Sequence, residues 1–312
     1  MSLWSRWLAW LARAEPGTSL ALFRIACGLC VIATVGTVVA HDLVQVIWLG
    51  SDHGGIRKLA RSTWLVEQLG GATPQVVWPL VWGSVAGGLL LTLGVGGRLA
   101  TFVTLQLFLG VSDINGQAGG SYDELLANGL WLLVLAGGDQ TLSWRCRRRT
   151  GSWHDPTPVP AWPRTLVLYQ LVLVYSSTGL QKLSAHWTPV GGFSALYYIL
   201  QQPSWHRADM SWLAHVYPLT QLATAGTWLF ELAAPLVLLA LYFRRTADRP
   251  GRLRAGFNRL RWRDAFVAIG VPMHLGVFLL MDVGPFTWVT LAFYVCLFSP
   301  QEWERAWRRW RS

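Results

Sequence analysis

The sequence contains runs of apolar residues that are too long for the interior of a small soluble domain. Residues 18–40 (TSLALFRIACGLCVIATVGTVVA) form the first such run, and residues 75–95 (QVVWPLVWGSVAGGLLLTLGV) form the second. A helix needs roughly 17–25 mainly apolar residues to cross a bilayer, and both runs have that length. The composition points the same way, because 53% of the residues are hydrophobic and only 13% are charged. We therefore expect an all-α, polytopic membrane protein.

The rest of the chain supplies further candidate spans, so we expect about eight transmembrane helices in a single domain over residues 1–312. The additional candidates are residues 98–113, 122–138, 163–182, 218–243, 264–282 and 284–300. Two connecting segments, 41–74 and 183–215, are too long for simple turns and contain short apolar pieces. Such pieces usually lie in the membrane interface or re-enter it.

The basic residues indicate how the spans are oriented. The segments expected on the outer side hold only Arg57, Lys58, Arg61 and Arg207, whereas most of the other Arg residues lie in segments expected inside. Cytoplasmic loops carry such an excess of Lys and Arg, so both termini are expected in the cytoplasm, with the chain in the plasma membrane. Confinement of the basic residues to these loops disfavours nucleic acid as a partner and favours an anionic lipid surface. The ends, 1–17 and 301–312, combine Trp and Arg on one helical face and are expected to be interfacial amphipathic helices.

Arg24 and Glu231 lie within expected spans, where a charge costs roughly 2.5–3.5 kcal/mol on insertion scales. Arg24 lies about one turn inside the first span, where it either snorkels to the headgroups or has an internal partner such as Glu231. Glu231 is in the middle of residues 218–243, and its side chain is too short to snorkel. It is therefore either protonated or paired with a cation, in a structural or a catalytic role.

His274 also lies near the middle of a span, after Pro272. It is either a hydrogen-bonded core residue or a functional group. We find no second His at metal-ligand spacing, so no metal site is expected. Cys27 and Cys30 form a C-x-x-C pattern, which inside an apolar helix is better explained by small residues on one face than by redox chemistry.

Residues 113–126 (DINGQAGGSYDELL) bring Gly and polar residues close to membrane depth. Irregular backbone at that depth has to line a cavity or water. Tyr122 and Asp123 would then face that cavity from the outer side. An ordinary loop explains the same residues.

Lys182 is the strongest candidate for a catalytic residue. It closes the fifth expected span, in YSSTGLQKLSAHW, with Trp187 just beyond. A snorkelling Lys is common at such a position, but this chain otherwise uses Arg almost throughout. A guanidinium keeps its proton, whereas an amine held in an apolar pocket can lose its proton and act as a base.

The stretch YSSTGLQKLSAHW, together with Gly191, Gly192 and the YYIL run that follows, resembles the signature of HTTM proteins. HTTM is the membrane domain shared with vitamin K-dependent gamma-carboxylases. LALFRIACGL, GGDQTLSW and VPMHLGVFLLMDVGPFTWVTLAFYVCLFSP are similar to other parts of that family. The resemblance runs in order over nearly the whole chain, and the G-x-x-K-L-x-x-x-W element is its most specific part.

The resemblance implies a polytopic fold with an outward-facing pocket and a quinol (vitamin K hydroquinone-like) cofactor. Lys182 matches the family's base, so a quinol-dependent oxidation or carboxylation follows as the expected function. From the residues themselves, the candidate catalytic groups are Lys182, His274 and Glu231. The candidate pocket residues are Tyr175, Trp187, Tyr122, Asp123 and Arg24. The chain departs from the family at Gly120, where the carboxylases place a His. It departs again at Ser143-Trp144-Arg145-Cys146, which lacks the acidic residue of the matching family segment.

These departures, and the expected absence of a large extracytoplasmic domain, favour an alternative. In that alternative the protein is a non-catalytic membrane partner in the maturation or export of a small peptide, or in immunity to it. A transporter is less favoured, because inverted repeats and paired broken helices are not visible in the sequence.

Overall fold

The computed structural model describes residues 2–55 and 64–311, and its elements are almost all helices. The expected all-α class is confirmed. Arg57, Lys58 and Arg61, which entered the charge argument, lie outside the described residues. The chain divides into two compact units: residues 1–167 with 288–312, and residues 168–287.

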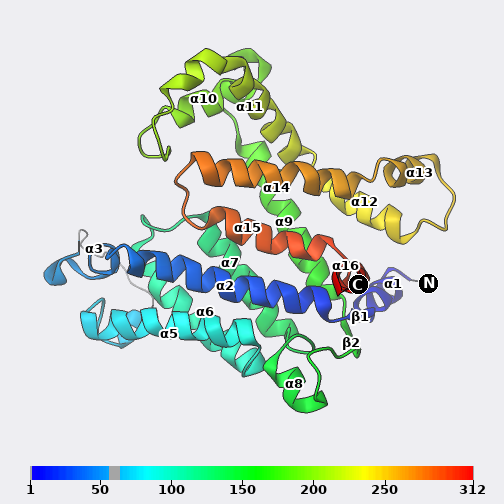
Figure 1. Ribbon diagram of the computed structural model, residues 1–312, viewed down its shortest axis with the longest axis horizontal. Coiled ribbons are helices and arrows are strands. Elements are labelled where there is room, and N and C mark those ends of the chain that lie inside the picture. The colour runs from blue at the N-terminus through cyan, green and yellow to red at the C-terminus, as the bar shows by residue number, and fades with distance from the viewer. Residues whose placement is uncertain (1, 56–63, 312) are drawn as a thin grey trace. The chain divides into compact units, whose positions relative to one another are not determined.

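The first unit is a bundle of antiparallel apolar helices (Figure 1). Its elements are α1 (Leu3–Leu11), β1 (Ala14–Pro16), α2 (Thr18–Ala40), α3 (Val44–Trp48), α4 (Trp64–Gln68), α5 (Pro74–Leu93), α6 (Gly97–Ser112), α7 (Ser121–Ala136), α8 (Trp144–Thr150), β2 (Pro158–Pro160), most of α15 (Phe286–Tyr294) and α16 (Pro300–Arg311). Short 3-10 turns add η1 (Ser51–His53), η2 (Asp113–Asn115) and η6 (Val295–Leu297).

Helices α2 and α5 pack closely because glycines face each other between them. A Cβ added at Gly28 would lie 2.6 Å from the carbonyl oxygen of Gly88, so only glycine allows this approach. Phe23 of α2 is fully buried and packs edge-on against Phe293 of α15, with 5.0 Å between the ring centroids. The core of the first unit therefore forms around α2, with α5, α7 and α15 against it.

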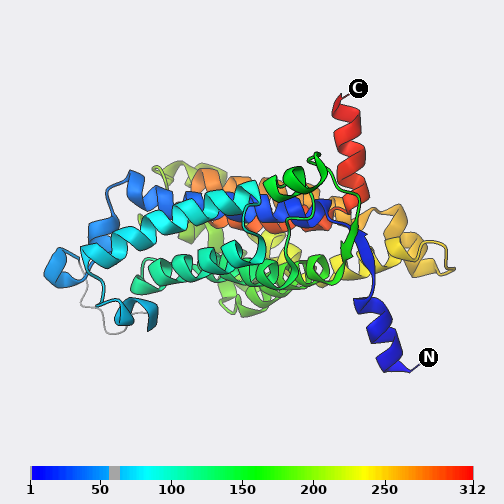
Figure 2. The same ribbon diagram turned by 90° about the horizontal axis from the view of Figure 1, so that it is seen from below.

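The helices α1 and α16 stand across the bundle rather than along it (Figure 2). Both lie at the end where α2 begins, and α16 contacts α2 and β1 there. The strands β1 and β2 pair antiparallel at the same end, with Glu15 opposite Val159. This placement agrees with the expectation that both chain ends are interfacial helices, which stays a prediction because the structure contains no membrane.

The second unit is built from the later part of α9 (Trp162–Gln181) and the helices that follow it. These are α10 (Ala195–Leu200), α11 (Tyr217–Leu232), α12 (Pro235–Arg245), α13 (Arg252–Arg259) and α14 (Trp262–Leu280). The expected outer segment 183–215 is not a plain loop: it contains η3 (Ala185–Trp187), η4 (Pro189–Gly191), α10 and most of η5 (Ser211–Val216).

One expected span is broken. Residues 218–243 were predicted to be continuous, but α11 and α12 meet at an angle of 55°. The break falls at Ala233 and Ala234, directly before Pro235 in the first turn of α12. Proline has no N–H to continue the hydrogen-bond ladder of α11, so it starts a new helix instead.

Within the described residues, three helical segments are long and apolar enough to cross a membrane, or four if the bent pair counts as one span. The three are Thr18–Ala40, Pro74–Leu93 and Arg252–Leu280, which contains α13 and α14. Large apolar side chains remain exposed on them, including Leu29, Trp82, Leu89 and Ile269. Exposed apolar surface on a long apolar helix is typical of a helix that faces lipid.

Candidate functional site

The site forms in the second unit, where α9 ends. The ammonium group of Lys182, the first residue after α9, donates a hydrogen bond to Oε2 of Glu231 near the end of α11. Both side chains are largely withdrawn from solvent, with 13% and 8% of their surface exposed. Glu231 therefore has the cationic partner that its position required, and the partner is Lys182 rather than Arg24.

An aromatic side chain lies over the ammonium group of this ion pair. The Nζ atom of Lys182 lies 4.6 Å from the centroid of the Trp187 ring, in cation–π geometry. The indole Nε1 of Trp228 donates to the carbonyl oxygen of Gly179 at 3.2 Å, which fixes α11 against α9 one turn before Lys182. Trp228 also stands beside Phe193, with ring centroids 6.4 Å apart.

A second buried pair joins α9 to α14. The hydroxyl of Tyr175 on α9 is hydrogen-bonded to Nε2 of His274 on α14. Tyr175 meets Phe230 and Phe266 edge-on, and those two rings stack with centroids 4.4 Å apart. Phe230 directly precedes Glu231, so the aromatic cluster and the ion pair share α11.

His274 is held in place through its backbone as well. Its carbonyl oxygen accepts a hydrogen bond from Thr287 Oγ1 at 3.0 Å, and its ring lies 5.5 Å from Phe286. The residue is 2% exposed. This geometry fits the hydrogen-bonded core residue of the sequence analysis and also fits a functional role through Tyr175.

The structure thus brings Lys182, Glu231 and Trp187 together, and joins Tyr175 of α9 to His274 of α14 next to Phe230 of α11. The other predicted site residues belong to the first unit. Tyr122 and Asp123 are half-buried in the first turn of α7, where Asp123 Oδ2 accepts the N–H of Gly120 at 3.0 Å. Asp123 thereby caps the first turn of α7.

Arg24 has a partner set that the sequence did not reveal. Its guanidinium donates to four backbone carbonyls: those of Leu91 and Thr92 at the end of α5, and those of Gly138 and Leu142 after α7. The residue is 2% exposed, so it does not snorkel to headgroups. Arg24 satisfies the last carbonyls of α5, which have no partner within the helix.

Gly179 is the site residue that sequence reasoning passed over. A Cβ there would lie 3.0 Å from Cβ of Glu231 and 3.1 Å from the backbone nitrogen of Leu232. Its spacing of three residues from Lys182 places both on one face of the helix. That spacing was present in the G-x-x-K element and could have indicated the close contact.

None of the family models, curated proteins or solved structures compared with the chain matches it. The resemblance to HTTM proteins and gamma-carboxylases therefore stays a prediction. In the part of the chain that the structure describes, no three His, Cys, Asp or Glu side chains are arranged to hold a metal ion.

Proposed function

We propose that this protein is an integral membrane protein of the plasma membrane with about eight spans and both termini in the cytoplasm. The alternation of α2, α5, α6 and α7 supports this topology. Arg98, Arg145 and Arg164 lie at the end of the first unit where α2 begins. Asp42, Asp52 and Asp113 lie at the opposite end, where α2 stops. The chain ends and the Arg-rich loops of the first unit then share the inner side.

Within the membrane, the protein acts as a quinol-dependent enzyme of the type suggested by the HTTM and gamma-carboxylase resemblance, with Lys182 as the base. The observation that carries this proposal is the buried Lys182–Glu231 pair beside Trp187. A structural salt bridge at a helix end would serve as well with Arg, whose guanidinium keeps its proton. Here the cation is an amine, the basic side chain that can give its proton up.

The residue types near the pair are chemically suited to a flat, lipid-soluble ring. Trp187 and Trp228 offer aromatic surface, and the exposed side chains of Leu180, Leu183 and Val190 offer an apolar approach. A bound quinol would supply two electrons, for which dissolved O2 would be the acceptor, and two hydroxyl protons. Lys182 and Trp187 are the residues that would contact its hydroxyl and its ring.

Glu231 prepares Lys182 for this role. As long as both groups are charged, they cancel each other's charge in apolar surroundings. If the proton moves from Nζ of Lys182 to Oε2 of Glu231, a neutral amine stands beside a neutral carboxylic acid, and the site still carries no net charge. The amine would then accept a proton from the substrate hydroxyl, and Glu231 would release the proton that it received to water, which restores the charged pair.

The test is quinol oxidation by the purified protein in lipid nanodiscs. Lys182→Arg preserves the charge and the pairing but removes the base, so we expect the rate to fall about 100- to 10,000-fold. Arg207→Lys is the control outside the site: it keeps the charge of an exposed residue that is hydrogen-bonded to the carbonyl of Met281 at 2.8 Å and lies 4.0 Å from Asp282. A wild-type protein without quinol oxidation, or a Lys182→Arg variant with the wild-type rate, would overturn the proposal.

A second candidate is the non-catalytic membrane partner of a small peptide. It is favoured by one feature of the site: Lys182 bonds to Glu231, and Tyr175 bonds to His274, as in a cluster that only stabilises the fold. In that case, Lys182→Arg keeps the peptide-related phenotype in cells, and Lys182→Ala lowers it only as far as it lowers the amount of folded protein.

A further inference from the structure

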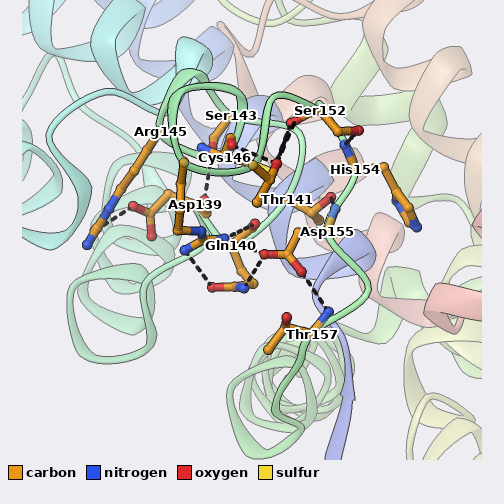
Figure 3. Close-up of polar contacts among 12 residues, drawn as sticks. Asp139, Gln140, Thr141, Ser143, Arg145, Cys146, Ser152, His154, Asp155 and Thr157 are labelled. Carbon is orange, nitrogen blue, oxygen red and sulfur yellow. Dashed lines mark hydrogen bonds and ion pairs between the residues drawn. The ribbon is translucent and has the colours of Figure 1, made fainter.

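The 139–157 loop of the first unit, between α7 and α9, is held in one shape by its own polar contacts (Figure 3). Asp155 is its centre: Oδ2 accepts from Gln140 Nε2 at 2.8 Å and from Arg149 at 2.5 Å. The Thr141 hydroxyl accepts the N–H of Asp155, and the N–H of Leu142 donates to the carbonyl of Trp153 at 2.7 Å.

Helix α8 within this loop is fixed just as firmly. Ser143 caps it, accepting the N–H of Cys146 at 2.9 Å and donating to the carbonyl of Asp139. The thiol of Cys146 is fully buried and lies 3.3 Å from the carbonyl oxygen of Ser152. The inner side of α8 is therefore filled by contacts within the loop, which leaves the other side for a partner.

The outward side of the loop carries aromatic and basic side chains together. Trp144 and Trp153 are 50% and 47% exposed, and their ring centroids are 6.3 Å apart. Arg147 and Arg148 are exposed and lie three and four residues after Trp144, so they share its face of α8. Arg145 is also exposed, but its guanidinium is bonded to Asp139 at 2.9 Å.

This Trp–Arg surface, defined here as Trp144, Trp153, Arg147 and Arg148, lies at the end of the first unit where the long helices stop. Arg24 of α2 and the end of α5 contact the loop directly, because Leu142 accepts from Arg24 at 2.6 Å and the N–H of Arg145 donates to Gly94. The pairing of β1 with β2 connects the end of the loop to the segment that follows α1. In a membrane-spanning bundle this end lies at headgroup depth.

We propose that the Trp–Arg surface is a docking site for the headgroups of anionic lipids such as phosphatidylglycerol. The charge is complementary, because Arg147 and Arg148 present guanidinium donors that bind phosphate oxygens. Trp residues prefer the interface between hydrocarbon and headgroups, so Trp144 and Trp153 set the depth at which the two Arg residues meet the phosphates. The polar network around Asp155 holds the surface in place before lipid binds. The proposal uses the membrane location but not the quinol chemistry.

The experiment places a fluorescent NBD label at His154→Cys in the full chain, reconstituted in nanodiscs that contain phosphatidylglycerol as a minor lipid in phosphatidylcholine. His154 is exposed beside the surface, and the four native cysteines are buried, so labelling is selective. Either the phosphatidylglycerol or the phosphatidylcholine is brominated, and quenching of the NBD fluorescence reports which of the two lipids lies near the label. We expect stronger quenching by brominated phosphatidylglycerol at equal mole fraction.

Arg147→Gln with Arg148→Gln should remove this preference, because each Arg near an anionic surface is worth about fivefold in binding. Arg148→Gln alone is the milder variant, since Arg147 also bonds to the carbonyl of Gly151 at the end of α8. An NBD label at Asp52→Cys, exposed in η1 beyond the other end of α2, is the control and should show no preference.

Equal quenching by the two lipids, or a preference that survives both Arg substitutions, would overturn the docking site while leaving the membrane location intact. Absence of quenching by either lipid would overturn both. None of these outcomes depends on whether the protein oxidises a quinol.

Discussion

Gly179 and Glu231 lie so close that a methyl group on Gly179 would stand 3.0 Å from Cβ of Glu231. Gly179 and Lys182 are three residues apart, so the close contact and the amine share one face at the end of α9. The missing side chain of Gly179 lets α11 approach α9 until the Glu231 carboxylate reaches Nζ of Lys182. A glycine thus sets the geometry of the ion pair.

We therefore predict that Gly179→Ala destabilises the protein by about 1–3 kcal/mol, as overpacking in a close contact does. It should also slow quinol oxidation, because α11 has to move away from Lys182. Gly226→Ala is the control: no atom lies within 4 Å of the added Cβ, and alanine favours a helix by about 1 kcal/mol. Thermal unfolding in detergent measures the stability of both variants. Equal stability of the two variants would contradict this account of Gly179.

The Lys182–Glu231 pair should show strong coupling in a double-mutant cycle. Lys182→Met leaves a carboxylate buried without its cation, and Glu231→Gln leaves the cation without its carboxylate. Each change is expected to cost about 3–5 kcal/mol. The double variant Lys182→Met, Glu231→Gln carries no charge at the site, so it should recover much of that loss. Unfolding of the four proteins in detergent gives the coupling, and additive single effects would show that the two groups do not stabilise each other.

The sequence predicted the long helices well and their interruptions poorly. Residues 18–40 coincide with α2, because uniform apolar character over that length has few alternatives to a span. Averaged hydropathy could not reveal the break between α11 and α12, since Ala233 and Ala234 are as apolar as their neighbours. Pro235 was the local signal for it. The sequence did not predict α8, because the segment WRCRRRT shows no periodic spacing of apolar residues.

For the site, the sequence indicated which groups needed partners but not which partners they had. Burial of Glu231 demanded a cation, and both Arg24 and Lys182 were available. The choice depends on the approach of α9 and α11, whose paired residues are 49 positions apart. The acceptors of Arg24 were hidden for another reason: they are backbone carbonyls, which every residue carries.

Arg24 gives a third prediction. Arg24→Leu leaves the carbonyls of Thr92, Gly138 and Leu142 without the guanidinium donor, while Leu91 keeps the N–H of Gly94. Each buried unsatisfied group costs about 1–3 kcal/mol. We expect this variant to fail to accumulate as folded protein. Arg24→Lys keeps the charge, but its ammonium group has fewer N–H donors than a guanidinium and they reach fewer separated carbonyls. This variant should fold with reduced thermal stability.

The matched control for Arg24 is Arg98→Gln. Arg98 also donates to a carbonyl of the first unit, that of Ala136 at 3.1 Å, but its side chain is exposed, so water can replace the bond. Its unfolding temperature should change little. Size-exclusion profiles and unfolding temperatures in detergent separate these cases, and a stable, monodisperse Arg24→Leu protein would refute the capping role.

The last prediction concerns acid and the 139–157 loop. The side-chain and backbone donors of Thr157 lower the pKa of Asp155 below its usual value, with a further contribution from Arg149. A lowered folded-state pKa means that Asp155 contributes its full stability above the usual carboxylate value near 4. That contribution is lost as the pH falls through the lower value. Anisotropy of a fluorescent label at His154→Cys should therefore drop in a transition below about pH 4.

Thr157→Ala should move the midpoint of this transition to higher pH, and Thr157→Ser, which keeps the hydroxyl, should not. In Asp155→Asn the label should already be mobile at neutral pH, with no such transition, and an unchanged midpoint in Thr157→Ala would show that Thr157 does not hold the carboxylate.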